Sequence, residues 1–165
     1  MIYKSTSLKE AEKNVAAIAR QLVDSRDKAL VLGLTGELGS GKTFFVKKFL
    51  SFLGVKEKVV SPTFVIMKEY ALTNKSNKTN KSDKIYKTNG TYKKAYHVDV
   101  YRLEDERSVL RLGLKEIVAE NGNIVFIEWA EKIKKLLPRS TIWIKFMHGK
   151  RENERILKYA HPSFN

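Results

Sequence analysis

The sequence GELGSGKT, residues 36 to 43, separates a short apolar run at residues 29 to 34 from an amphipathic stretch at residues 42 to 53. The apolar run is bounded by charge and by glycine, as is typical of a buried strand. The apolar residues of the following stretch fall on one helical face, and Gly54 is placed to end that helix. A strand, a glycine-rich loop and a helix are therefore predicted in direct succession.

The octapeptide matches the pattern G-x-x-x-x-G-K-[ST], in which glycines let backbone N–H groups curl around phosphate oxygens. Lys42 is expected to reach the β and γ phosphates and to take part in catalysis, and the Thr43 hydroxyl to ligate the Mg²⁺ that bridges them. The positive end of the helix dipole faces the same phosphates. The pattern predicts a site that binds Mg²⁺-ATP and hydrolyses it. The predicted nucleotide-binding residues are Glu37, Leu38, Gly39, Ser40, Gly41, Lys42 and Thr43.

Such a site needs a second carboxylate at the carboxyl end of a neighbouring parallel strand. Glu128 ends the apolar run at residues 124 to 127, which is the usual form of such a strand. It is predicted to hold the metal. The alternative is that it is only the first polar residue after a core strand.

Asp99 is the candidate for orienting or deprotonating the attacking water, which makes it a predicted catalytic residue. The alternative is a surface carboxylate paired with Arg102. His97 and Trp129 lie near these carboxylates in the sequence. Since a lone histidine is more often structural and a tryptophan after a strand more often belongs to the core, neither is assigned a catalytic role.

The rest of the chain alternates between helical and strand periodicity, which predicts an α/β fold of the P-loop NTPase type. We expect a mostly parallel sheet flanked by helices, with an antiparallel edge contributed by the C-terminus. Ser7 and Glu10 form a capping box for a first helix. The further helices are expected at residues 107–119, interrupted near Gly113, and up to Leu137; the further strands are expected at residues 64–72, 96–101, 124–127, 141–147 and 155–160.

The length of 165 residues predicts a single domain, residues 1–165. Its formal net charge is +14, of which residues 73 to 94 supply +6 through seven lysines and one aspartate. This basic, low-complexity tract is predicted to be a surface insertion. It either touches tRNA phosphates or is a solvated insertion without a role.

The absence of cysteine excludes disulfides, thiolate nucleophiles and cysteine-ligated metals. No secretory leader and no run long enough to cross a bilayer is found, so a cytoplasmic protein without membrane contact is expected.

Four motifs occur in order along the chain: GELGSGKT, then SPTF at residues 61–64, YHVDVYRLED at residues 96–105 and IEW at residues 127–129. In this the sequence resembles the TsaE (YjeE) family. The resemblance implies a small P-loop ATPase, weakly active alone, that works with TsaB-like and TsaD-like proteins in making N6-threonylcarbamoyladenosine at tRNA position 37. It further implies that Thr43 and Glu128 bind Mg²⁺, Lys42 the phosphates, that Asp99 serves hydrolysis, and that residues 61–64 form a switch-like loop.

Two other functions would use the same loop. A small-molecule kinase should also carry an acceptor pocket and an arginine-bearing lid, whereas the tract at residues 73 to 94 contains no arginine. A basic RNA-binding module, in which the nucleotide only stabilises the fold, would function normally without Lys42 or Glu128.

Overall fold

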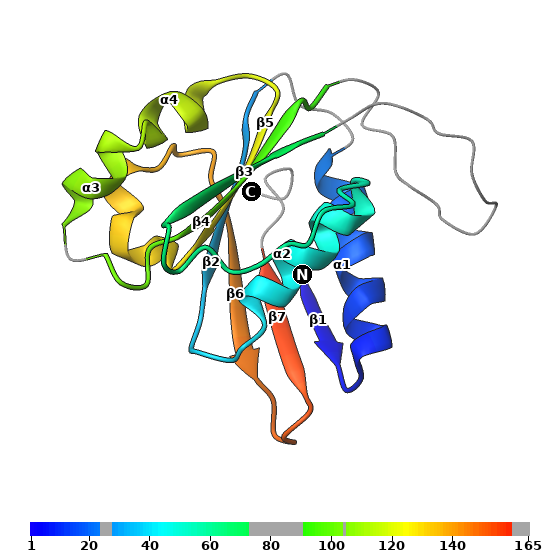
Figure 1. Cartoon of the computed structure of the whole chain (residues 1–165). Coiled ribbons are helices and arrows are strands. Elements are labelled where there is room, and N and C mark those ends of the chain that lie inside the picture. Colours follow the sequence, from blue (N-terminus) through cyan, green and yellow to red (C-terminus); the bar gives the residue numbers. More distant parts are fainter. Residues whose placement is uncertain (24–27, 73–90, 104, 160–165) are drawn as a thin grey trace.

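Seven strands of the described residues form one sheet, in the order β1-β7-β6-β2-β5-β4-β3 (Figure 1). The computed structural model describes residues 1–23, 28–72, 91–103 and 105–159. The strands are β1 (Ile2–Ser5), β2 (Leu30–Thr35), β3 (Met67–Ala71), β4 (Lys94–Asp99), β5 (Asn123–Glu128), β6 (Ile142–His148) and β7 (Arg155–Tyr159). The helices are α1 (Leu8–Val23), α2 (Lys42–Phe52), α3 (Glu106–Arg111), α4 (Leu114–Ala119) and the 3₁₀ helix η1 (Ala130–Leu136).

The four central strands, β6, β2, β5 and β4, run parallel to one another. Strands β7, β1 and β3 are each joined antiparallel to a neighbour. The α/β class and the antiparallel pairing of the C-terminal strand are thus confirmed. The described sheet is mixed, however, and its edge beyond β7 is the unpredicted strand β1. Because β1 has four residues and buries only Ser5, it carries no readable periodicity.

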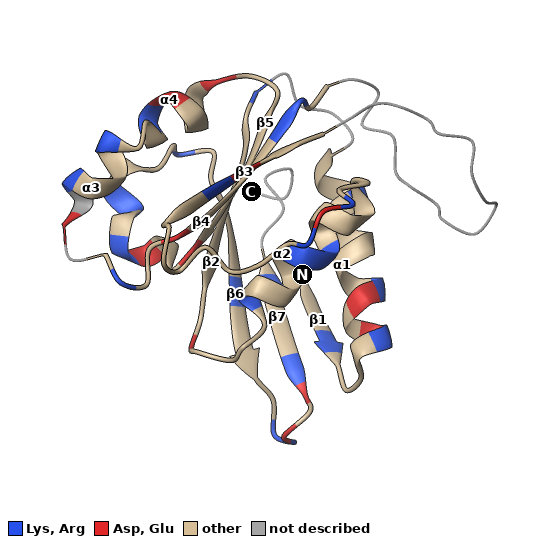
Figure 2. Cartoon of the chain, in the orientation of Figure 1, with Lys and Arg blue, Asp and Glu red and all other residues tan. Residues whose placement is uncertain are grey.

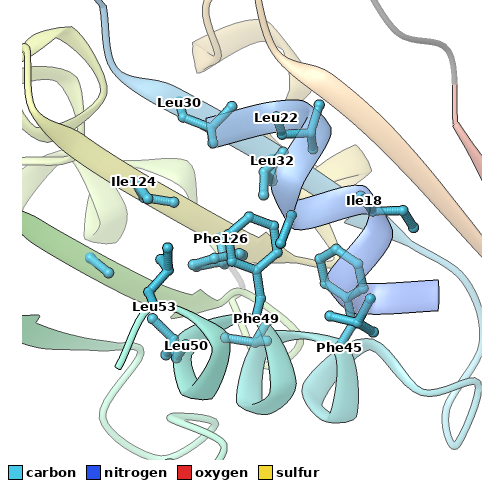
Figure 3. Packing of buried hydrophobic residues seen from close by; sticks show 14 of the residues in the cluster. Ile18, Leu22, Leu30, Leu32, Phe45, Phe49, Leu50, Leu53, Ile124 and Phe126 are labelled. Atoms are coloured by element: carbon cyan, nitrogen blue, oxygen red, sulfur yellow. The ribbon is translucent and has the colours of Figure 1, made fainter. Parts of the chain in front are cut away.

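Helices α1 and α2 pack on one face of the sheet, and α3, α4 and η1 pack on the other (Figure 1). Phe49 of α2 meets Phe126 of β5 edge to face at 5.0 Å between ring centroids, beside Ile18 and Leu22 of α1 (Figure 3). Val125, the neighbour of Phe126, belongs to the opposite cluster. Residues of β5 are therefore buried alternately on both faces, which explains its continuous apolar sequence.

The strand predicted from residue 64 begins only at Met67. The backbone N–H groups of Val65 and Ile66 both donate to the carbonyl oxygen of Pro62, at 2.9 and 2.6 Å, and Ile66 has a positive φ of 66°. This turn leaves Phe64 81% exposed. Apolar residues that suggested a strand are thus used in an exposed turn.

The predicted surface insertion is wrong at its C-terminal end. Lys94 already belongs to β4, and the side chain of Tyr92 is fully buried. The backbone N–H of Leu72 donates to the carbonyl of Lys93 at 2.8 Å, so the two ends of the tract meet across this bond. The rest of the tract, residues 73 to 90, lies outside the described residues.

The predicted start of the first helix is confirmed, since the Ser7 hydroxyl accepts the Glu10 N–H at 3.2 Å. The Glu10 carboxylate reaches back to the N–H and hydroxyl of Thr6, at 2.7 and 2.9 Å, one residue before the position that a capping box would use.

No helix in the described part of the chain is long and apolar enough to span a membrane.

Candidate functional site

The glycine-rich loop lies between β2 and α2, at the carboxyl end of a central parallel strand. Three of its glycines have positive φ: 136° at Gly36, 73° at Gly39 and 105° at Gly41. A Cβ on Gly36 would lie 2.3 Å from the carbonyl oxygen of Phe146, so the close approach to β6 also requires glycine there. The Ser40 hydroxyl donates to the Glu37 carbonyl at 2.7 Å and ties the loop together.

The end of this loop and the start of α2 carry backbone N–H groups that are open to a ligand. A Cβ built on Gly41 meets no atom within 4 Å. Within the part of the chain that the structure describes, the N–H groups of Gly41, Lys42 and Thr43 have no acceptor, as expected where a helix begins. Glu37 and Leu38 are exposed beside them. This arrangement suits a ligand with several anionic oxygens.

Lys42 is only 4% exposed, and its ammonium contacts the start of the loop. Its Nζ donates to the carbonyl oxygens of Gly36 and Glu37, at 2.6 and 2.9 Å, and lies 4.0 Å from the centre of the Trp129 ring. Burial lowers the pKa of Lys42 from its usual 10.5, against the opposing attraction of the carboxylates led by Glu128.

Glu128 is placed beside the loop by the parallel pairing of β2 with β5, in which Leu34 is opposite Glu128. The Thr43 hydroxyl donates to Glu128 Oε2 at 3.0 Å, across 85 residues of sequence. Glu128 is 3% exposed. The two residues that were predicted to share a metal ion are therefore in direct contact.

Asp99 ends β4 directly opposite Glu128 and is 5% exposed. Its Oδ2 accepts the hydroxyls of Ser61 and Thr63, at 3.0 and 2.5 Å, and its Oδ1 accepts the Tyr101 N–H at 3.0 Å. The alternative of a surface carboxylate paired with Arg102 does not match this burial.

Arg102 turns instead to the exposed turn at residues 62–66. Its guanidinium lies 4.4 Å from the centre of the Phe64 ring. The loop with the SPTF sequence is thus tied to the site by its hydroxyls, while its aromatic and aliphatic residues, Phe64 and Val65, face outward at 81 and 66% exposure.

Two residues without a predicted role belong to this cluster. His97 is fully buried, and its Nε2 lies 2.7 Å from Glu128 Oε1. Trp129 follows β5 with a positive φ of 60°, under the Lys42 ammonium. The strand alternation that places His97 on the face of Asp99 was a usable signal, whereas the backbone conformation of Trp129 has no counterpart in the sequence pattern.

The oxygen atoms of Thr43 and Glu128 suit a hard cation whose other ligands come from outside the protein. Thr43 and Glu128 offer a hydroxyl and a carboxylate, which are oxygen ligands of the kind that Mg²⁺ prefers. Among the described residues, no three histidine, aspartate or glutamate side chains gather as a protein-only metal site would require. A magnesium ion held here would draw its remaining ligands from phosphates and water.

A family model described as threonylcarbamoyl adenosine biosynthesis protein TsaE matches residues 9–157 of the chain. The chain belongs to the TsaE family. This confirms the resemblance that the four motifs indicated. The match includes the glycine-rich loop, Asp99 and Glu128.

Two relatives named tRNA threonylcarbamoyladenosine biosynthesis protein TsaE illustrate the similarity. The protein of Rickettsia typhi is 36% identical over 92% of this chain and 90% of its own length. That of Rickettsia conorii is 33% identical over 77% of this chain, and the match spans only 62% of that relative's length. Among solved structures, Bacillus subtilis YdiB is similar, with a TM-score of 0.63 and 27% identity over 96% of this chain and 83% of YdiB. This chain and YdiB thus share a fold.

Proposed function

We propose that this TsaE family member is a P-loop ATPase that binds Mg²⁺-ATP and acts in the formation of N6-threonylcarbamoyladenosine at tRNA position 37. The contact between Thr43 and Glu128 carries the proposal. It brings the hydroxyl at the start of α2 to the carboxylate at the end of the neighbouring strand. The N–H groups of Gly41, Lys42 and Thr43 beside it have no acceptor among the described residues. These are the parts that a triphosphate and its metal need.

ATP phosphates would lie along the loop from Glu37 to Thr43 and attract the Lys42 ammonium away from the two loop carbonyls that it now contacts. Charge-assisted contacts to phosphate are stronger than contacts to carbonyl groups, which favours this exchange. The contact of the ammonium with the Trp129 ring keeps it near the same place, and no carboxylate of the described residues forms an ion pair with it. Lys42 would thus stabilise charge that develops on the transferred phosphoryl group.

Thr43 and Glu128 would hold Mg²⁺, which when bound neutralises charge on the phosphates during hydrolysis. Asp99 would orient the attacking water or accept its proton. Both carboxylate oxygens of Asp99 already accept hydrogen bonds, from Ser61, Thr63 and Tyr101. Release of the two hydroxyls would free one oxygen, which offers a physical reason for slow turnover by the chain alone.

TsaB-like and TsaD-like proteins are the proposed partners, and tRNA is reached through their complex or through the basic tract. The exposed residues Phe64 and Val65 would let a partner move the loop that carries Ser61 and Thr63. We place this activity in the cytoplasm.

Calorimetry with ATP, in the presence of Mg²⁺ and of EDTA, tests the proposal on the chain alone and with purified TsaB-like and TsaD-like proteins. We expect Mg²⁺-dependent binding that Lys42→Ala abolishes and that Lys47→Ala, an exposed neighbour on α2, leaves intact. ATP hydrolysis should rise when the partners are added. Absence of Mg²⁺-dependent binding under both conditions would rule out the proposal, and phosphoryl transfer to a screened metabolite would favour a kinase.

A further inference from the structure

His97 is the most deeply buried polar side chain next to the candidate site. It lies on β4 with a fractional exposure of 0%, opposite Phe126 of β5. Its Nε2 is 2.7 Å from Glu128 Oε1, and its Nδ1 is buried without a hydrogen-bond partner in the described part of the chain. One ring nitrogen is thus used and the other is not.

This asymmetry assigns the proton to Nε2. A hydrogen on Nδ1 would be a buried donor without an acceptor, which is costly, whereas a bare Nδ1 is only an unused acceptor. With the hydrogen on Nε2, His97 donates to the Glu128 carboxylate.

The two oxygens of Glu128 have separate partners. Oε1 accepts from His97, and Oε2 accepts from the Thr43 hydroxyl at 3.0 Å. A carboxylate held by one oxygen cannot rotate freely about its last side-chain bond. The contact from His97 therefore fixes the plane of the carboxylate, with its other oxygen facing the start of α2.

We propose that His97 is a positioning residue that fixes the Glu128 carboxylate so that Oε2 faces the metal position beside Thr43. The proposal rests on the function proposed above. Residues that hydrogen-bond a metal ligand from behind typically change metal affinity tenfold to a hundredfold when they are replaced. His97 would act in this way without contacting nucleotide or metal.

The main alternative to the positioning role is that His97 only fills space in the core, since its ring is fully buried. The two roles differ in what a substitution of similar size should do. A side chain that fills the space but lacks a donor would preserve the packing and remove the hydrogen bond to Glu128. A side chain with an amide at the place of Nε2 would hold Glu128 again.

The test compares His97→Phe, His97→Asn and His97→Gln in the full chain. Gln places its amide nitrogen near the position of Nε2, whereas Asn places it near Nδ1 and cannot reach Glu128. ATP binding is titrated by calorimetry at increasing Mg²⁺ and again in EDTA. We expect Phe and Asn to raise the Mg²⁺ concentration for half-maximal binding about tenfold, and Gln to stay within about threefold of the parent.

The affinity for ATP in EDTA should be the same in all folded variants, because His97 acts only through Glu128. Equal loss with and without Mg²⁺, or equal behaviour of Asn and Gln, would assign His97 to packing. If Phe does not fold, the Asn and Gln variants decide the question alone. Absence of Mg²⁺-dependent binding in the parent protein would overturn the proposed function, whereas Mg²⁺-dependent binding that the His97 variants leave unchanged would overturn only the positioning role.

Nitrogen NMR of the metal-free protein gives an independent readout. We expect the His97 ring to carry its hydrogen on Nε2 and the corresponding signal to shift in Glu128→Ala. A hydrogen on Nδ1 alone would overturn the proposal, since the ring could not then donate to Glu128.

Discussion

Lys42 combines deep burial with an unusual set of contacts, two loop carbonyls and an indole face. Carbonyl oxygens compensate a buried charge less fully than a carboxylate at contact distance does, which agrees with the lowered pKa of Lys42. The side chain is therefore poised for a stronger anionic partner. A phosphate would supply that partner and raise the pKa again.

This reasoning predicts a pH dependence of ATP binding. Because the pKa of Lys42 lies below 10.5 in the free protein and phosphate would raise it, binding should take up protons as the pH approaches the lowered pKa from below. The affinity should then fall as the pH rises through that value. Calorimetry in two buffers of different ionisation enthalpy measures the uptake. Lys42→Arg stays charged in this range, so a variant that still binds should show no such uptake.

The burial of Lys42 also makes the free energy of unfolding depend on pH, but this quantity rises with pH where the ATP affinity falls. Below its lowered pKa, the charged Lys42 costs stability in the native state, and an unfolded lysine keeps its proton up to about pH 10.4. Between these two values the unfolded state binds more protons. The contribution of Lys42 to the free energy of unfolding should therefore increase as the pH rises through that window.

Asp99→Asn separates binding from turnover. Asparagine keeps an oxygen for the Tyr101 N–H but cannot act as a base. With partners present, we expect the hydrolysis rate to fall by about 10²- to 10⁴-fold, while the dissociation constant for ATP stays within about threefold. Asp105→Asn, at the exposed N-cap of α3, is the matched control and should change neither. An unchanged rate in Asp99→Asn would remove Asp99 from the hydrolytic step.

At the scale of elements, α2 is held to the sheet by its aromatic face. Phe49 packs against Phe126 of β5 and lies 5.7 Å from the Phe45 ring on the same helix. Since Lys42 and Thr43 begin this helix, the packing of Phe49 also fixes where the loop ends. The candidate site therefore depends on a core contact two turns away.

Phe49→Ala should lower the free energy of unfolding by about 3–5 kcal/mol, because it leaves a cavity in a fully buried cluster. Chemical denaturation followed by circular dichroism measures this as a lower midpoint at unchanged slope. Phe64→Ala is the control of equal size change. At 81% exposure it should change stability by less than about 0.5 kcal/mol. Similar losses in the two variants would contradict the described packing.

Over the whole molecule, Lys and Arg are spread across the helices and strands, and Asp and Glu lie among them (Figure 2). The remaining +8 of net charge outside residues 73 to 94, obtained from +14 less +6, is thus not gathered in one element. The tract between β3 and β4 is one strongly basic segment of the sequence, with +6 from residues 73 to 94. A long-range attraction to tRNA would draw on that segment.

Replacing residues 74 to 90 with a short glycine-serine turn tests this attraction. The bond between Leu72 and Lys93 shows that a short connection can span the ends, so the melting temperature and the Mg²⁺-ATP affinity should be preserved. Affinity for unmodified tRNA should fall, and its dependence on salt concentration should become shallower. A variant of equal length with the lysines changed to glutamine controls for length. Unchanged tRNA affinity in both variants would show that the tract has no part in binding.

The sequence alone determined the features that depend on residues close together in the chain. Glycine conformation, side-chain caps and a 3.6-residue period are set within a few residues. The local features are therefore the loop at residues 36 to 43, the capped start of α1, and α2, which ends at Phe52 shortly before Gly54. The buried run of β5 was readable for the same reason. Family membership also followed from the order of short motifs.

Only the tertiary structure decided which of these segments meet. Thr43 and Glu128 are 85 residues apart, and their contact depends on the pairing of β2 with β5. The bond from His97 to Glu128 depends on the pairing of β4 with β5. Periodicity gives the face on which a side chain lies but not its neighbouring strand, because strand order results from the packing of the whole sheet.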